Sequence, residues 1–211
     1  MRQSSADLNR LRLHGWLGAA PVLSHVNHGL DFYRFPLVVP RLSGVEDRIN
    51  VIAPLTLLEQ RGLWLPEQEL TVVGEVRTFN NRSGTGSRLV INAFAREVTA
   101  QCGEYENCLE LTGTLCKTPC LRSTPLGRTI CDMILAVNRR YGRADYLPCI
   151  AWGSLAHRCG SLGIGGRIRL NGRLQSRVYT KAAEDRMEER TAFEVSVMSL
   201  AEEEQAFSEA D

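Results

Sequence analysis

Residues 135–153 read LAVNRRYGRADYLPCIAWG, and this stretch decides the fold class. Apolar and polar residues alternate up to Asn138, a basic segment follows, and the alternation then resumes through Tyr146 to Trp152. A period of two is typical of a β-strand with one buried face, and the basic segment between the two runs indicates a turn. The stretch therefore predicts two neighbouring strands that carry arginines and aromatic rings.

The same stretch belongs to an internal repeat with an offset of 98 residues. NRLRLHGWLGAAP, which begins at Asn9, matches NCLELTGTLCKTP, which begins at Asn107. Further matches at this offset are PLVVPR (36–41) with ILAVNR (134–139), Asp47 with Asp145, Ile52 with Ile150, Leu70 with Ile168 and Gly74 with Gly172. Such self-similarity predicts two copies of one domain, at 8–100 and 107–200, with an acidic tail at 201–211.

Each copy has the pattern of five short strands and one helix. In the second copy the strand-like runs fall at 107–116, 128–139, 145–152, 166–179 and 190–199. Between the third and fourth runs, SLAHRCGSLGIGG (154–166) predicts a short amphipathic helix that ends in glycines, and LTLLEQRGLWLPE (55–67) holds the matching place in the first copy. This pattern predicts an all-β protein made of two tandem OB-fold five-stranded β-barrels.

The composition, with 44% hydrophobic and 23% charged residues, is that of a globular protein, and no stretch approaches the roughly 18 apolar residues of a membrane span. The first residues, MRQSSADLNRLRLHG, lack the apolar core of a signal peptide, so we expect a cytoplasmic protein. The seven cysteines all lie between Cys102 and Cys159. An odd number of cysteines is typical of reduced thiols in the cytosol.

Charge is distributed unevenly along the chain. Residues 107–200 hold 14 basic and 8 acidic side chains, whereas residues 8–100 hold 10 and 8. The tail from Ala201 has five acids and no base, which brings the formal net charge of the whole chain down to +1. A basic second copy favours a polyanionic partner. The tail is either a solvated end or a competitor of that partner for the basic surface.

Residues 107–199 resemble the bacterial single-stranded DNA-binding protein family, through LAVNRRY, DYLPCIAWG and the run GSLGIGGRIRLNGRLQSRVYT. The first copy is similar only through the repeat. The resemblance implies the OB barrel and sequence-independent coating of single-stranded DNA in replication, repair or recombination. Members have one OB domain and form tetramers, or two and form dimers, so we expect a homodimer with four barrels. The family's acidic tail ends in a Pro-Phe tip, which AEEEQAFSEAD lacks.

The family's base-stacking rings carry over to Tyr141, Tyr146, Trp152 and Tyr179 of this chain. Arginines and a lysine surround these positions: Arg122, Arg128, Arg139, Arg140, Arg143, Arg173, Arg177 and Lys181. Aromatic rings stack on any base, and Lys or Arg neutralises phosphates, so together they predict DNA binding without base specificity. The alternatives are that the rings belong to the barrel core and that the arginines form a solvated face.

The first copy lacks the four rings. At the same offset, Ser43, Arg48, Pro54 and Asn81 stand where the second copy has Tyr141, Tyr146, Trp152 and Tyr179. Other rings of the first copy, Phe32, Tyr33, Phe35, Trp64 and Phe79, fall outside this register. We therefore predict that the first copy binds DNA weakly and mainly supplies a dimer or inter-domain surface.

Other chemistry has weak support. The spacings Cys116-x-x-x-Cys120 and His25-x-x-His28 do not match the paired ligands of structural zinc sites, so no metal and no other cofactor is expected. No nucleophile–base arrangement stands out, so we do not expect an enzyme. The rival function is an OB-fold protein-interaction module of the primosomal or phage-accessory kind. A preference for RNA also stays open, because stacking does not distinguish the sugars.

Overall fold

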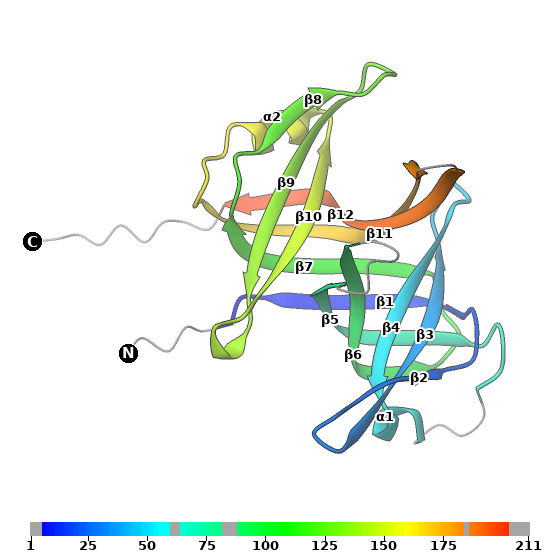
Figure 1. Cartoon of the computed structure of the whole chain (residues 1–211). Helices are drawn as coiled ribbons and strands as arrows, with labels where there is room; N and C mark the ends of the chain where they lie inside the picture. The colour runs from blue at the N-terminus through cyan, green and yellow to red at the C-terminus, as the bar shows by residue number, and fades with distance from the viewer. Residues whose placement is uncertain (1–5, 60–63, 82–87, 184–185, 203–211) are drawn as a thin grey trace, which may run out of the picture. The chain divides into compact units, whose positions relative to one another are not determined.

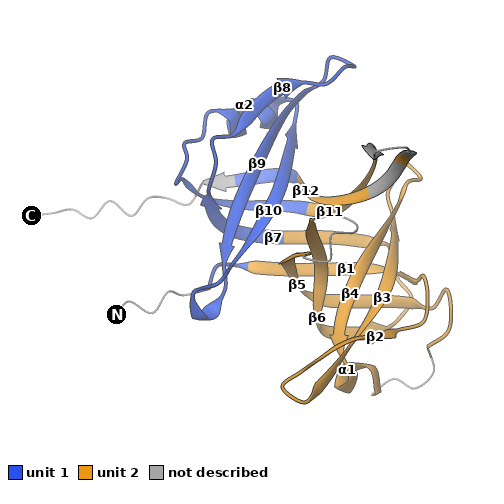
Figure 2. Ribbon diagram, viewed as in Figure 1, with its two compact units in different colours: residues 1–8, 110–172, 197–211 blue, residues 9–109, 173–196 orange. Residues whose placement is uncertain are grey.

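The computed structural model describes residues 6–59, 64–81, 88–183 and 186–202. The chain divides into two compact units, which Figure 2 colours separately. Unit 1 consists of residues 1–8, 110–172 and 197–211, and unit 2 of residues 9–109 and 173–196. Three strands of the second repeat therefore contribute residues to both units.

The first repeat forms a closed barrel within unit 2 (Figure 1). Its elements are β1 (Asn9–Leu17), β2 (Val22–Asn27), β3 (Leu30–Pro40), β4 (Glu46–Pro54), α1 (Leu55–Glu59), β5 (Glu69–Asn80) and β6 (Leu89–Ala100). The strand order is β2-β3-β4-β6-β5-β1, and a further pairing between β3 and β1 closes the ring. The ring consists of the five strands β1, β3, β4, β6 and β5, and a closed five-stranded ring of this kind is the OB-fold barrel.

The second repeat has the same strand order. Its elements are β7 (Glu106–Leu115), β8 (Cys120–Ser123), β9 (Thr129–Asn138), η1 (Arg140–Gly142), β10 (Ala144–Trp152), α2 (Ser154–Gly160), β11 (Arg167–Ala183) and β12 (Arg186–Glu202). The order is β7-β11-β12-β10-β9-β8, and β7 pairs with β9 to close the ring. The predicted all-β fold of two tandem OB barrels is confirmed.

Two short strands, β2 and β8, were not predicted from the sequence. Every residue of both strands is exposed, so neither has the buried face that produces an alternating pattern. The helices agree with the prediction in place, but each is only one or two turns long. Within the described part of the chain, no helix has the length and apolar character needed to cross a bilayer.

Strand β10 illustrates how the sequence places the core. The odd-numbered residues of this strand are buried: Asp145, Leu147, Cys149 and Ala151. Tyr146 and Trp152, which belong to the even-numbered row, are exposed. A strand sends successive side chains to opposite faces, so the odd-numbered residues fill the barrel. The even-numbered row is thereby left on the outer face.

A glycine in the first strand of each repeat lets that strand cross close to its neighbour. A Cβ added at Gly113 would lie 2.6 Å from the carbonyl oxygen of Ala136, and one at Gly15 would overlap the carbonyl of Val38. Both contacts join the first strand to the strand that closes the ring. Only glycine has no Cβ at these positions, so the close pairing needs it.

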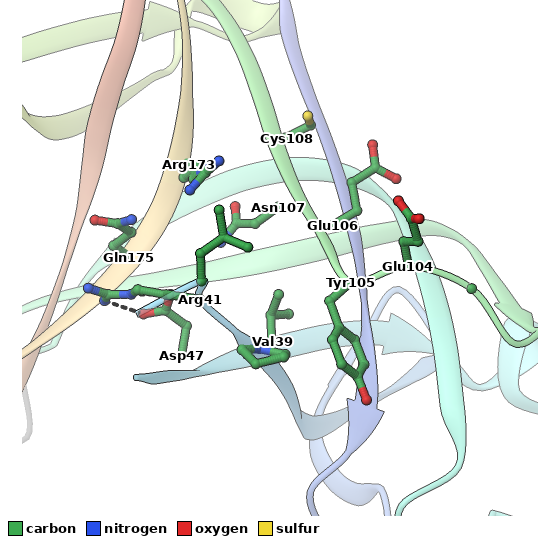
Figure 3. Close-up of a pocket in the computed structure, with 13 residues that line it drawn as sticks. Val39, Arg41, Asp47, Glu104, Tyr105, Glu106, Asn107, Cys108, Arg173 and Gln175 are labelled. Atoms are coloured by element: carbon green, nitrogen blue, oxygen red, sulfur yellow. Dashed lines mark hydrogen bonds and ion pairs between the residues drawn. The ribbon is translucent and has the colours of Figure 1, made fainter. Parts of the chain in front are cut away.

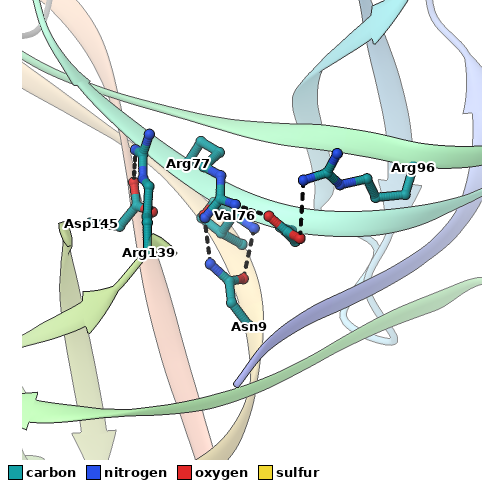
Figure 4. Close-up of polar contacts among 7 residues, drawn as sticks. Asn9, Val76, Arg77, Arg96, Arg139 and Asp145 are labelled. Atoms are coloured by element: carbon teal, nitrogen blue, oxygen red, sulfur yellow. Dashed lines mark hydrogen bonds and ion pairs between the residues drawn. The ribbon is translucent and has the colours of Figure 1, made fainter. Parts of the chain in front are cut away.

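An asparagine at the start of each repeat makes the same pair of hydrogen bonds. The Asn9 side chain donates to the Val76 carbonyl at 2.8 Å and accepts from the Val76 N–H at 2.9 Å (Figure 4). Asn107 donates to the Leu174 carbonyl at 2.8 Å and accepts from its N–H at 3.0 Å. Asn107 and Leu174 are the residues that correspond to Asn9 and Val76 at the offset of 98. The repeat seen in the sequence therefore extends to side-chain contacts.

Candidate nucleic-acid interface

Two of the predicted rings lie on the outer face of β10. Tyr146 is 53% exposed and Trp152 is 42% exposed. They stand six residues apart on one strand, which keeps them on the same face and about 20 Å apart. The alternative that these rings belong to the core is therefore wrong.

The third ring, Tyr141, projects from the turn between β9 and β10 and is 97% exposed. Its backbone has φ 67° and ψ 32°, the left-handed conformation that a side chain makes costly. The N–H of Arg139 donates to the carbonyl of Arg143 at 2.7 Å and closes this turn. The turn thus holds a ring in solvent between arginines.

Arg122 lies on the same outer face as Trp152. Ile130 on β9 stands opposite Arg122 on β8 and opposite Trp152 on β10, so the three side chains form one row across the sheet. Strands are about 4.8 Å apart, which places Arg122 roughly 10 Å from the tryptophan. Its Nε donates to Asp132 at 2.5 Å. The pair is exposed on both sides, so water and phosphate compete with it.

The arginines of the β9–β10 turn differ in their partners. Arg139 donates from two guanidinium nitrogens to the carboxylate of Asp145, whose side chain is wholly buried (Figure 4). Arg140 and Arg143 are exposed, and neither forms an ion pair with a carboxylate of the described residues. Arg128, in the β8–β9 loop, is exposed as well. The contribution of Arg139 to binding stays a prediction, and its engagement with Asp145 is structural.

The remaining predicted residues fall on the part of β11 that belongs to unit 2. Arg173 lines a hollow of about 730 Å³ beside Gln175, as Figure 3 shows. Arg177 is exposed, with its Nε 4.0 Å from a carboxylate oxygen of Glu194, and Tyr179 is half-buried. Lys181 lies on the strand, but its side chain is outside the described ones. Arg173 and Gln175 are two residues apart on the strand and line the same hollow.

The structure thus brings together two sets of predicted residues, each within one unit. Unit 1 holds three rings and five arginines: Tyr141, Tyr146, Trp152, Arg122, Arg128, Arg139, Arg140 and Arg143. Unit 2 holds Arg173, Arg177, Tyr179 and Lys181. The participation of each residue in binding stays a prediction.

The rings of the first repeat mostly pack on one another. Phe35 is fully buried and packs against Trp64, with 5.5 Å between the ring centroids. Phe32 lies between His25, on which it stacks at a centroid distance of 4.9 Å, and the tilted ring of Phe94 at 5.9 Å. Arg96 lies over the Phe94 ring at 5.1 Å. The alignment of the two repeats did not predict this cluster of packed rings, because its members come from three separate strands. It leaves Phe79, which is 47% exposed, as the exposed phenylalanine of this repeat.

The seven cysteines all fall in the described part of the chain, and none forms a disulfide. Burial raises the pKa of the Cys159 thiol to about 11, and burial also raises the pKa of Cys131. No group of three or more His, Cys, Asp or Glu side chains among the described residues has an arrangement that could hold a metal ion.

Sequence reasoning missed that one arginine of each repeat is engaged by a buried aspartate. Arg41 donates to Asp47 at 2.8 and 2.6 Å, and Arg139 stands in the same relation to Asp145. The hydrogen bond to Asp47 raises the pKa of the Arg41 guanidinium, which keeps the guanidinium charged. The alignment of both aspartates at the offset of 98 carried the signal for this pair.

The fold and the outer face of β10 define an OB-fold protein with exposed rings beside cations. A comparison with known families matches residues 106–201 to the Single-strand binding protein family. Over these residues the chain is similar to the single-strand binding protein family. By their names the curated relatives are single-stranded DNA-binding proteins.

Three curated relatives each match part of the chain. Single-stranded DNA-binding protein 2 of Listeria innocua is 35% identical over 80 residues, 35% of this chain and 50% of the relative. The single-stranded DNA-binding protein of Halalkalibacterium halodurans is 33% identical over 100 residues, which are 44% and 56% of the two chains. Single-stranded DNA-binding protein A of Bacillus subtilis is 36% identical over 80 residues, 35% and 46%. The chain spans about half the length of these relatives.

A solved structure resembles the whole chain. The wild-type single-stranded DNA binding protein from Thermus aquaticus has a TM-score of 0.77 and 24% identity, over 98% of each chain. A deletion mutant of the Thermus protein matches with a TM-score of 0.76. At this identity the likeness establishes the fold, which covers both barrels.

Proposed function

We propose that the chain binds single-stranded DNA without base specificity and that most contacts come from residues 106–201. The observation that carries this proposal is the exposure of Tyr146 and Trp152 on one outer face of β10. A large apolar ring on the surface costs solvation free energy unless a ligand covers it. The match of this segment to a family of single-strand binding proteins gives further support.

The proposed chemistry divides between rings and arginines. Tyr141, Tyr146 and Trp152 offer flat faces to bases, and stacking contributes about 1–3 kcal/mol per base whatever its identity. Arg140 and Arg143 extend into solvent beside Tyr141 and are placed to neutralise phosphates. Each phosphate contact releases counterions, so binding should weaken as salt rises.

The test is quenching of tryptophan fluorescence on titration with oligo-dT at two salt concentrations. The chain has three tryptophans, so Trp152→Phe separates the contribution of β10 from those of Trp16 and Trp64. We expect strong quenching in the wild type, a steep loss of affinity with salt and little quenching in the variant. Unchanged fluorescence of the wild type with oligo-dT would overturn the proposal.

The rival function is an OB-fold protein-interaction module of the primosomal or phage-accessory kind with weak DNA contact. It is favoured by the first repeat, which lacks all four rings. Under this alternative, oligo-dT does not quench, and Trp152→Ala behaves as the wild type. A parallel titration with oligo-rU distinguishes a preference for RNA.

The assembly and the setting are part of the same proposal. We propose a cytoplasmic homodimer that presents four barrels and acts in DNA replication, repair or recombination, with the first repeat supplying the dimer or inter-domain surface. Light scattering should then give a mass of about 47 kDa, twice the 23.5 kDa of one chain. A mass of one chain at micromolar concentration contradicts the dimer but leaves DNA binding unaffected.

A further inference from the structure

A small hollow in unit 2 is lined by two aromatic rings and two carboxylates. Trp16, Tyr105, Glu67 and Glu69 surround a volume of about 360 Å³. None of these residues belongs to the proposed DNA surface. Tyr105 also borders the larger hollow of Figure 3, and it projects from the segment between the two repeats.

The strand pairing of the first barrel brings these groups together. Trp16 on β1 stands directly opposite Glu69 on β5, so both side chains leave the same face of the sheet. Glu67 lies in the turn before β5, where its N–H donates to the Leu17 carbonyl at 3.0 Å. The ring of Tyr105 meets that of Trp16 edge-on, at 5.4 Å between centroids and 65° between planes. Two aromatic rings and two carboxylates therefore converge from three separate segments.

The carboxylates of the hollow have no arginine or lysine partner among the described residues. Glu69 accepts a hydrogen bond from the Gly103 N–H at 3.2 Å. The same oxygen lies 3.6 Å from Nε2 of His14, a nitrogen that is buried and makes no hydrogen bond in the described structure. By contrast, Glu106 nearby is neutralised by Arg12 at 2.7 Å. The hollow thus keeps a negative charge beside two π faces.

We propose that this hollow binds the guanidinium group of an arginine side chain from a partner protein. A guanidinium is flat, so it stacks on aromatic faces while its N–H groups reach carboxylates, which an ammonium cannot do in the same geometry. The volume lies at the lower end of the range for ligand pockets and accommodates one side chain with water. A nucleic acid is excluded because its phosphates would be repelled by the carboxylates.

The proposal is tested with the full chain and N-acetyl-arginine amide as the probe. The indole N–H signal of Trp16 is assigned in ¹H–¹⁵N spectra by its loss in Trp16→Phe, and the probe is titrated into the wild type. We expect this signal to shift and saturate, while those of Trp64 and Trp152 stay in place. N-acetyl-lysine amide should shift it with lower affinity, and N-acetyl-glutamate should have no effect.

Substitution of the carboxylates decides between binding and simple packing. Glu67→Gln combined with Glu69→Gln should raise the Kd for the probe at least about fivefold, because the loss of charge removes the attraction for a cation and leaves the rings in place. Glu97→Gln, an exposed carboxylate of β6 outside the hollow, is the matched control and should bind as the wild type. If the double variant loses its dispersed spectrum, Glu67→Gln alone, in an exposed turn, provides the comparison.

Two outcomes would overturn the proposal. One is a Trp16 indole signal that does not shift when the arginine probe is added, and the other is the same Kd for the probe in the wild type and in the glutamine variant. Oligo-dT is titrated separately and should act on Trp152 instead. A failure of DNA binding therefore leaves this inference standing, and a silent Trp16 signal leaves the proposed DNA binding standing.

Discussion

The guanidinium of Arg41 donates two hydrogen bonds to the buried carboxylate of Asp47, at 2.8 and 2.6 Å. The same carboxylate accepts from the backbone N–H of Ser176 at 2.6 Å and from its hydroxyl at 2.8 Å. Four donors thus surround a side chain that is 1% exposed. A buried carboxylate of this kind is stable only while its donors are in place.

Asp47→Ala should destabilise the protein by about 2–4 kcal/mol, because it leaves the Arg41 guanidinium and the Ser176 donors without their acceptor. The measurement is urea unfolding followed by circular dichroism. Asp132→Ala is the control, since its pair with Arg122 is exposed on both sides and should contribute at most about 1 kcal/mol. Equal effects of the two substitutions would contradict this account of the buried pair.

Gly113→Ala should destabilise by about 2–3 kcal/mol, because the added Cβ would lie 2.6 Å from the Ala136 carbonyl oxygen and would push two paired strands apart. Gly163→Ala is the matched control. A Cβ there meets no atom within 4 Å, so the change should stay within about 0.5 kcal/mol. Thermal unfolding of both variants checks the prediction, which fails if Gly113→Ala melts with the wild type.

Tyr146→Ala and Trp152→Ala should each weaken binding to oligo-dT by about fivefold to a hundredfold, the loss of one stacked base. Both rings are exposed, so the free energy of unfolding should change little. Fluorescence anisotropy with labelled oligo-dT measures the affinity, and a melt of each variant serves as the folding check. Wild-type affinity in both variants would remove the rings from the site.

Arg140→Gln together with Arg143→Gln should reduce the slope of log affinity against log salt by about 1.4, which is about 0.7 per phosphate contact for two contacts. Arg12→Gln removes the same charge from a side chain that pairs with Glu106 at 2.7 Å and should leave the slope unchanged. Titrations at four salt concentrations give the slopes. An unaltered slope in the double variant would place the phosphates elsewhere.

The free energy of unfolding should fall as pH rises from about 9 towards 11. Burial raises the pKa of Cys159 to about 11, from an ordinary value of 9.0, so the unfolded thiol ionises first. The folded protein then binds more protons than the unfolded chain, and stability decreases with pH in this window. Cys159→Ala should flatten this decrease in urea titrations at pH 8, 9.5 and 10.5. The same slope in the variant would assign the effect to other groups.

The sequence allowed much of the fold to be predicted because burial imposes a pattern on it. In β10 the alternation of apolar and polar residues predicted the strand itself, while the structure decided that Tyr146 and Trp152 lie on its exposed face. β2 and β8 escaped prediction because all of their residues are exposed. The rings of the candidate site were taken from the resemblance to the family, and their role in binding stays a prediction.

The contact made by Arg139 could not be predicted from the sequence. In the sequence Arg139 is one of three arginines beside Tyr141, and its alignment with Arg41 at the offset of 98 does not show which side chain it contacts. In the structure its guanidinium is turned to the buried Asp145, whereas the other two extend into solvent. The charge of an arginine does not show which residue it contacts. That depends on which residues the turn and the barrel bring within hydrogen-bond distance.

By itself the sequence determined the two repeats and the barrel class, since each depends on a local period or on a constant offset along the chain. Only the tertiary structure decided that Arg41 and Arg139 are held by aspartates, and that Trp16, Glu69 and Tyr105 meet around one hollow. Each of these arginines lies only 6 residues from its aspartate, whereas Trp16, Glu69 and Tyr105 come from segments that are far apart in the sequence. Their geometry depends on the register of strand pairing and on barrel closure, which the linear pattern of residue types does not encode.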